Sequence, residues 1–260
     1  MIQLSGVIIT YNEERNIQRC IDSLLNIVDE IVIVDSLSTD RTVSICKKNP
    51  KTRVVLQEFL GYKEQKNFAV QQAKFDYIVS LDADEALCPI LQKNILALKE
   101  QNTFAKDGYY ANRFNNFCGT WVKHSNWYPD KKLRVFKKGK GVWRGINPHD
   151  SYELHEKSKA GKLQGDILHW NYATPEEYLT QVNRFSSISA QAYYELGIKP
   201  NWWRLTWNPF WIFFRAFFLK RGFLDGKLGW FICLQSANLT YLKYAKLQLL
   251  YNKEENKTKK

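Results

Sequence analysis

The N-terminal part of the chain alternates between short apolar runs and stretches in which apolar residues recur at helical spacing. The apolar runs lie at 4–9, 31–34, 53–56 and 77–81. The helical stretches lie between and after them, at 17–25, 41–48, 63–73 and 90–99. Each run has the length of a strand, and each periodic stretch fits one face of a helix. This alternation predicts an α/β fold with a mostly parallel sheet and helices on both faces.

The pattern changes after residue 105. From Gly108 to about residue 170 the chain consists of short, aromatic, strand-like pieces separated by turn signals such as KKGKG. We expect these pieces to extend the same sheet in mixed orientation. Residues 1–172 then form one domain, in which 1–105 and 106–172 are two successive parts.

A helical region is predicted after this domain, at 173–252. Thr174 can cap a helix, Pro175 suits its first position, and Glu177 completes a capping box. Gly197 is a typical helix stop. The polar residues 253–260 predict a frayed, disordered tail.

The segment 201–230 combines aromatic residues with cations. Its longest charge-free apolar stretch, 205–214, is much shorter than the ~20 residues that span a bilayer. Trp and Phe mixed with cations are typical of an amphipathic helix that lies on a membrane surface, and Pro209 predicts a break or kink in it. The alternative is a buried core helix whose basic residues reach solvent. The cations in and around this stretch are Arg204, Arg215, Lys220 and Arg221.

Charge and cysteine content narrow the class of protein. The formal net charge is +12, and residues 199–260 hold 12 Lys and Arg against 3 Asp and Glu. The basic character therefore describes a partner surface near the C-terminus. The five cysteines are scattered without CxxC spacing, which argues against a disulfide framework or zinc site and suits a reducing compartment. The start MIQLSGVIIT has no signal-peptide pattern, so we expect a cytoplasmic protein.

The motif DADE carries the clearest chemistry. The apolar run 77–81 delivers Asp82 and Asp84 to its carboxyl end, and residues two apart on a strand lie on the same side. Paired carboxylates suit Mg²⁺ or Mn²⁺, which neutralises a diphosphate. TYNE follows the first strand, and Asp35 opens DSLSTD after the second, where it can accept hydrogen bonds from a base or ribose. The chain has no GxGxxG motif and no Walker lysine, which disfavours dinucleotide and P-loop sites.

Together these loops resemble a known family. VIITYNEERNIQRCIDSL, EIVIVDSLSTDRTVSIC and GYKEQKNFAVQQAKFDYIVSLDADE are similar to the family 2 glycosyltransferases, whose Rossmann-like fold is called GT-A. The similarity is greatest to the branch that adds glucose to the inner core of bacterial lipopolysaccharide. It covers roughly residues 4–170, and it continues through GDILHWNY and FLKRGFLDGKLGW.

The resemblance implies a role for individual residues. Residues 1–105 would bind the nucleotide sugar, and 106–172 would form the acceptor side of the catalytic domain. The metal ligands would be Asp84, Asp82 and, at GDILHW, His169. Independently of the resemblance, Arg134 in KKLRVFKK can neutralise the leaving diphosphate, because an arginine grips phosphate oxygens with a planar fork; the alternative is an arginine on a strand surface. The nucleotide-sugar site would contain Thr10, Tyr11, Asn12, Glu13, Asp35, Lys66, Asn67, Asp82 and Ala83.

An inverting transferase also needs a base that takes the proton of the acceptor hydroxyl. Similar sequences carry a His-acid pair downstream of the D-x-D motif, and GVWRGINPHD offers His149 and Asp150 here. We expect Asp150 to be the base, with Glu156 in LHE as the alternative.

The sequence thus predicts an inverting, metal-dependent hexosyltransferase. It would use Mg²⁺ or Mn²⁺ and move a sugar, glucose from UDP-glucose by the resemblance, to a lipid-linked or lipopolysaccharide-core acceptor. Its partners would include an anionic membrane surface at the inner face of the cell membrane, and no nucleic acid; homo-oligomer formation is left open. Two alternatives are a sugar nucleotidyltransferase and a non-catalytic basic, aromatic protein that binds membrane or nucleic acid. The former normally shows a Gly-rich basic loop after the first strand, and the latter leaves the three acidic loops unexplained.

Overall fold

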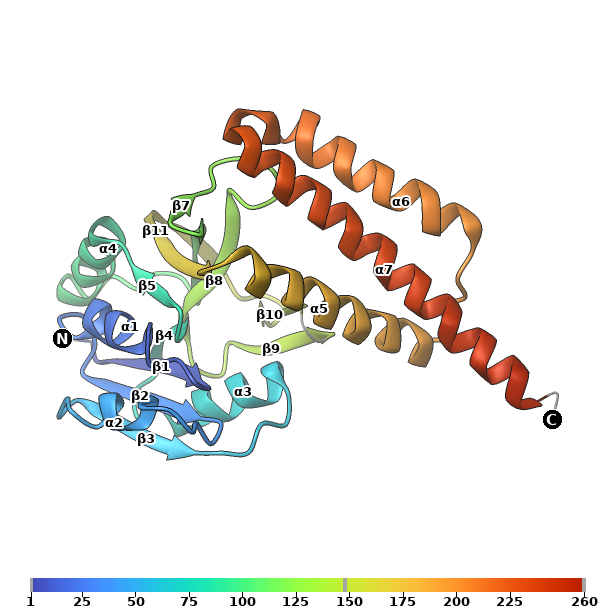
Figure 1. Ribbon diagram of the computed structural model, residues 1–260. Coiled ribbons are helices and arrows are strands. Elements are labelled where there is room, and N and C mark those ends of the chain that lie inside the picture. The colour runs from blue at the N-terminus through green and yellow to red at the C-terminus, as the bar shows by residue number, and fades with distance from the viewer. Residues whose placement is uncertain (1, 147–148, 259–260) are drawn as a thin grey trace. The chain divides into compact units, whose positions relative to one another are not determined.

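The computed structural model describes residues 2–146 and 149–258, which form two compact units (Figure 1). The first unit consists of Met1–Asn115, Asp130–Gly145 and His149–Asn171. The second consists of Asn116–Pro129, Ile146–Pro148 and Tyr172–Lys260. The boundary that the sequence predicted near residue 172 separates a catalytic domain from a helical region. It stays a prediction, because it assigns a function to each part of the chain.

A parallel sheet forms the N-terminal part of the first unit. Its strands are β1 (Leu4–Thr10), β2 (Glu30–Asp35), β3 (Thr52–Leu56) and β4 (Tyr77–Asp82), in the order β3-β2-β1-β4. The register pairs Thr10 with Asp35 and Ile9 with Asp82. The loops that carry TYNE, DSLSTD and DADE therefore leave the sheet at the same edge, as the sequence predicted.

Helices cover both faces of these strands because successive side chains point to opposite faces. They are α1 (Ile17–Leu24), α2 (Thr42–Cys46), α3 (Tyr62–Gln72) and α4 (Pro89–Glu100). Ile8 and Ile33 share one buried cluster with residues of α1, α2 and α4. Val7 and Val32 share the cluster of the opposite face with residues of α3.

The rest of the sheet is antiparallel, so the whole sheet is mixed and not mostly parallel. After β4 the order continues β8-β6-β11-β5, and the pairs β4–β8, β6–β8 and β11–β5 are all antiparallel. β7 (Thr120–Trp121) pairs with β6. β9 (Gly141–Ile146) and β10 (His149–Leu154) form a separate two-stranded sheet. The remaining strands are β5 (Glu85–Leu87), β6 (Gly108–Phe117), β8 (Asp130–Lys137) and β11 (Ala160–Tyr172).

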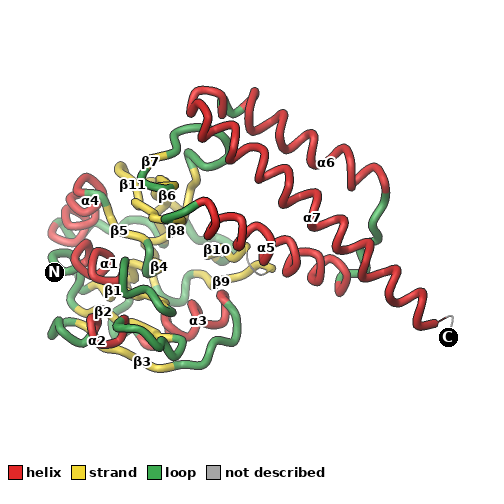
Figure 2. The backbone as a smooth tube through the Cα atoms, in the orientation of Figure 1, coloured by secondary structure: helices red, strands yellow, loops and turns green. Residues whose placement is uncertain are grey.

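Helices dominate the second unit (Figure 2). α5 (Pro175–Glu195) begins as predicted, because the Thr174 side chain accepts a hydrogen bond from the backbone N–H of Glu177 (3.2 Å). α6 (Trp202–Phe214) leads through the π-turn η1 (Arg215–Leu219) and the 3₁₀ turn η2 (Gly222–Asp225) into α7 (Gly226–Thr258). None of the described helices is both long and apolar enough to cross a membrane.

Two features of this unit differ from the sequence prediction. α6 continues through Pro209, so the break predicted as one possibility there does not occur, whereas the alternative of a kink stays a prediction. A proline removes one helical hydrogen bond, and the packing of α6 against α7 holds the flanking turns together. α7 continues to Thr258, into the stretch 253–260 that was expected to be a frayed tail. Helix formation is cooperative, so a long helix carries its last turns with it.

Candidate active site

The loops after β1 and β2 are joined by hydrogen bonds. The backbone N–H of Asn12 donates to Ser38 Oγ (2.8 Å), and that of Thr39 donates to Asn12 Oδ1 (2.8 Å). The buried Asp35 carboxylate accepts bonds from the backbone N–H and the hydroxyl of Ser38. Asn12 has φ +53°, a conformation that Asn tolerates better than most residues. The structure thus brings the predicted nucleotide residues Asn12 and Asp35 to one hydrogen-bonded pair of loops.

The other predicted residues of the TYNE loop differ in their surroundings. Thr10 is buried, and its Oγ1 has no hydrogen-bond partner among the described residues. Tyr11 is exposed. The Glu13 carboxylate accepts a bond from Asn16 Nδ2 (2.8 Å). Burial raises the pKa of Glu13 to about 7, and the negative charge of Asp84 adds to this effect.

Lys66 links two carboxylates that lie far apart in the sequence. From α3, its Nζ lies 3.0 Å from Asp82 Oδ1 and 2.9 Å from Asp150 Oδ2. The side chains of Lys66 and Asp150 are each only 7% exposed. Burial alone would raise the pKa of Asp82, but Lys66 and Arg134 hold it well below its usual range. The structure therefore joins the DADE loop to the predicted base through one buried cation.

Arg134 binds the same loop from β8. Its Nε and Nη2 donate to the two carboxylate oxygens of Glu85 (3.2 and 3.0 Å), and Nη2 also lies 3.0 Å from Asp82 Oδ2. Arg113 of β6 contacts Glu85 (3.5 Å) and Asp130 (2.9 Å). Burial works against ionisation of Glu85, yet the Arg134 charge keeps its pKa below the usual value. The predicted contact of Arg134 with a diphosphate stays a prediction, because here its guanidinium is bonded to carboxylates.

Trp143 of β9 covers the two cations. Lys66 Nζ lies 4.5 Å from its ring centroid and the Arg134 guanidinium carbon 5.2 Å, both within cation–π range. Asn67 and Trp143 exchange two hydrogen bonds between the amide side chain and the Trp143 backbone, each of 3.0 Å. In this structure Asn67, predicted near the nucleotide, holds the aromatic cover in place.

Strand pairing brings His169 to the DADE loop. The register of β11 with β5 pairs His169 with Glu85. His169 Nε2 lies 3.1 Å from Asp84 Oδ2, and His169 Nδ1 lies 2.8 Å from Asn115 Oδ1. When the ring proton of His169 is on Nδ1 and is donated to Asn115, the lone pair of Nε2 faces the Asp84 carboxylate. A metal-binding histidine coordinates its ion through such an unprotonated ring nitrogen.

The pair fits a divalent metal ion. Two neighbouring ligands of an octahedral ion, each at about 2.1 Å, lie about 3 Å apart, and the Asp84 and His169 atoms are 3.1 Å apart. No group of three or more His, Cys, Asp or Glu among residues 2–146 and 149–258 is placed to hold a metal. The predicted third ligand, Asp82, is engaged by Lys66 and Arg134. A site with two protein ligands is still typical of Mg²⁺, which completes its shell with water and substrate phosphates.

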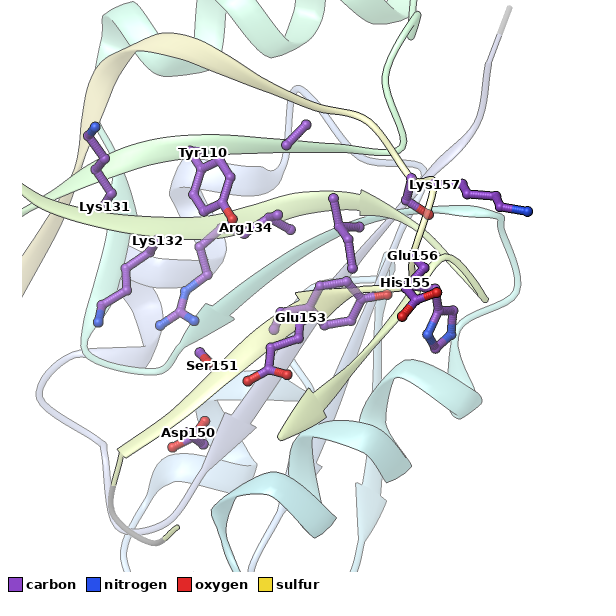
Figure 3. Close-up of a pocket in the computed structure, with 15 residues that line it drawn as sticks. Tyr110, Lys131, Lys132, Arg134, Asp150, Ser151, Glu153, His155, Glu156 and Lys157 are labelled. Atoms are coloured by element: carbon purple, nitrogen blue, oxygen red, sulfur yellow. The ribbon is translucent and has the colours of Figure 1, made fainter. Parts of the chain in front are cut away.

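Both candidate bases line one cavity of about 660 Å³ along β8 and β10 (Figure 3). Asp150 lies at one end of the labelled lining, beneath Ser151, and Glu156 lies at the other. Glu156 is exposed in the turn that follows β10, whereas Asp150 contacts Lys66. The side chain of His149, expected beside Asp150, lies outside the described part of the structure. Ala83, the last predicted residue, is buried.

Several residues of this site were not predicted from the sequence. Glu85 belongs to DADE, and its charge was a visible signal. Ser38 lies in DSLSTD, but no role in the site was predicted for it. Arg113, Asn115 and Trp143 lie in the aromatic, strand-like part of the chain, where no local motif marks them.

Comparisons with known proteins show which family this chain is similar to. The family model "Glycosyl transferase family 2" matches residues 5–153, a range that includes all three loops and Asp150. An uncharacterized glycosyltransferase of Rickettsia felis is 33% identical over an alignment that covers 98% of this chain and 93% of the relative. The lipopolysaccharide core biosynthesis glycosyltransferase LpsC of Rhizobium meliloti is 28% identical, with 95% and 92% covered.

Among solved structures, S. aureus TarS 1–349 in complex with UDP-GlcNAc matches with a TM-score of 0.49 and 15% identity, covering 97% of this chain and 92% of that one. The family match covers more than half of this chain, and the Rickettsia felis relative matches almost all of it. The structure confirms the predicted α/β architecture with helices on both faces of the sheet, and the family match confirms the glycosyltransferase resemblance. This chain belongs to glycosyl transferase family 2.

Proposed function

We propose that this protein is an inverting, metal-dependent glycosyltransferase that uses a UDP-sugar, with Asp84 and His169 as metal ligands and Asp150 as the base. The donor is UDP-glucose on the resemblance to the lipopolysaccharide inner-core branch. The acceptor is a lipid-linked glycan or lipopolysaccharide core at the cytoplasmic membrane face. The name of the LpsC relative, which refers to lipopolysaccharide core biosynthesis, supports this class of acceptor.

The observation that carries the proposal is the position of Asp150. Its carboxylate is joined through Lys66 to Asp82, and Asp82 is two residues from Asp84, which faces His169. A base for the acceptor and a metal pair for the donor diphosphate are thus held in one network within the first unit. Metal-assisted transfer to a hydroxyl needs both.

In the proposed reaction the acceptor oxygen attacks the anomeric carbon, and the bond from that carbon to the diphosphate oxygen breaks with inversion. Asp150 accepts the hydroxyl proton. Asp150 is paired with Lys66 at 2.9 Å in this structure, so this contact must lengthen for the carboxylate to take the acceptor proton. When bound, the divalent ion supplies positive charge that stabilises the departing UDP. The Thr10 hydroxyl, which has no hydrogen-bond partner within the described part of the chain, and the loops that carry Asn12 and Asp35 are available to the nucleotide.

Membership of family 2 separates this proposal from the alternatives. It supports sugar transfer over nucleotidyl transfer and over a purely binding role. A donor screen tests the proposal: the purified protein is incubated with UDP-sugars, Mn²⁺ and a membrane-derived acceptor, and UDP release is measured. We expect release that needs both metal and acceptor and is fastest with UDP-glucose. The absence of release with every UDP-sugar would contradict the proposal.

A further inference from the structure

Helix α6 exposes its aromatic side chains to an unusual degree. No residue of α6 is buried, and Trp202, Trp203 and Phe210 are 76%, 64% and 55% exposed. Contiguous apolar surface of this kind is rare on soluble proteins and marks a site of interaction. We therefore expect the exposed aromatic surface of α6 to contact a partner.

The aromatic rings on α6 form a continuous row. Ring centroids are 5.3 Å apart for Trp203 and Trp207, 5.4 Å for Trp207 and Phe210, and 6.4 Å for Phe210 and Phe214. Phe218 of η1 continues the row, 5.2 Å from Phe214. The spacing of three or four residues places these side chains on one face of the helix. We call these five residues the aromatic row.

A different side of α6 holds it to the rest of the second unit. Leu205 packs on the buried cluster that contains Tyr244 and Leu247 of α7. Asn208 Nδ2 donates a hydrogen bond to the Tyr244 hydroxyl (3.0 Å). The attachment of α6 thus uses side chains outside the aromatic row, which leaves the row free for another contact.

The turn between α6 and α7 extends the same surface. Four of its five large apolar residues are between 48% and 58% exposed: Phe218, Leu219, Phe223 and Leu224. Exposed cations surround them at Arg215, Lys220, Arg221 and Lys227. Residues 202–224 contain no acid, and the next one, Asp225, accepts hydrogen bonds from the backbone and ring of His124.

We infer that the aromatic row and this turn form a docking surface for an anionic lipid bilayer. Aromatic rings favour the boundary between headgroups and acyl chains, and cations beside them favour anionic headgroups. A second copy bound to the same surface would bring like charges together, whereas anionic lipid neutralises them. The inference extends the sequence prediction for α6 to the turn and does not depend on sugar transfer.

Vesicle sedimentation of the full chain tests this surface. Vesicles of phosphatidylcholine alone are compared with equal parts phosphatidylcholine and phosphatidylglycerol, at low and high salt. We expect strong binding to the anionic vesicles and weak binding to the neutral ones, with the difference reduced at ~1 M salt because the Debye length falls to ~3 Å. Substituting Arg215, Lys220 and Lys227 with Gln should weaken anionic binding about a hundredfold, at about fivefold per cation. Substituting Trp203, Trp207 and Phe210 with Ser should abolish it.

Matched control variants remove exposed cations or exposed apolar side chains outside the proposed docking surface. Gln at Lys47, Lys48 and Lys93 removes three exposed cations of the first unit, and Ser at Leu196 and Leu249 removes two exposed apolar side chains of the second. Both controls should bind as the unmodified chain does. Quenching of tryptophan fluorescence by brominated lipid tests the unmodified chain directly.

Three results would overturn the inference: equal binding to both vesicles, no binding to either, or controls as weak as the test variants. A dimer in sedimentation velocity that the Ser variants convert to monomer would also overturn it, by showing that a second copy covers the surface.

Discussion

The Nζ atom of Lys66 lies 2.9 Å from Oδ2 of Asp150, although 84 residues separate them in the sequence. The same Nζ contacts Asp82 at the end of β4. One buried cation therefore joins the donor side of the proposed site to its proposed base.

Replacing Lys66 with Met should lower the free energy of unfolding by about 3 kcal/mol, because it leaves the buried carboxylate of Asp150 without its cation. Adding Asp150→Asn should restore part of that loss, since the two substitutions act on one ion pair. Urea denaturation measures both effects. Lys63→Met is the control on the same helix, because Lys63 pairs with Glu64 at the surface (3.4 Å) and should cost about 0.5 kcal/mol or less. Equal losses for the two lysines would contradict the network.

Asp150→Asn should lower kcat by about 10²–10⁴, since the amide cannot accept the proton. Binding of the UDP-sugar should persist, which titration calorimetry can measure. Glu156→Gln changes an exposed carboxylate at the far end of the cavity and should be far milder. The opposite ranking of these two variants would assign the base to Glu156.

Asp84→Asn and His169→Gln should each weaken Mn²⁺ binding in the presence of UDP, because they remove the two proposed ligands. Asn115→Ala should weaken it about 10–100-fold, since Asn115 orients the imidazole from the opposite ring nitrogen. Titration with Mn²⁺ measures these affinities. Asp22→Asn, an exposed acid on α1, should leave them unchanged. Unaltered Mn²⁺ affinity in the Asp84 and His169 variants would exclude this metal site.

Glu13 should make the metal-free protein less stable at high pH. Its pKa in the folded chain is about 7 against an ordinary value of 4.5, so the folded state holds this proton more tightly. The resulting stabilisation is complete below pH 4.5 and is lost as the pH rises through 7. Relative to the unmodified chain, Glu13→Gln should therefore gain up to about 3 kcal/mol between pH 5 and pH 8. Urea denaturation at both pH values measures this gain, and a difference that does not change with pH would disprove the effect.

Much of the sheet edge was predictable because its signals are local. The apolar runs before Asn12, Asp35 and Asp84 predicted strands, and the parallel order then placed the following loops together. Thr174 was recognisable as a cap from the residues directly after it. Such features depend on neighbours within a few positions, which a single sequence displays.

The charge network was not predictable, because its contacts join residues that lie far apart in the sequence. The contacts of Glu85 with Arg134 and of Lys66 with Asp150 depend on the antiparallel half of the sheet and on the β9–β10 pair. Register between strands that lie far apart in sequence has no local signal. The same holds for Trp143, whose position over Lys66 follows from its hydrogen bonds with Asn67 on another element.

The proposed sugar transfer depends on Asp150 as the base and on a metal ion at Asp84 and His169. The most direct measurement follows radiolabel from UDP-glucose into a lipid-extractable product, using the purified chain, a membrane-derived acceptor and Mn²⁺. We predict incorporation by the unmodified chain, its loss with EDTA or Asp84→Asn, and a fall of at least about 10² with Asp150→Asn. Incorporation that persists with EDTA and in both variants would contradict the account.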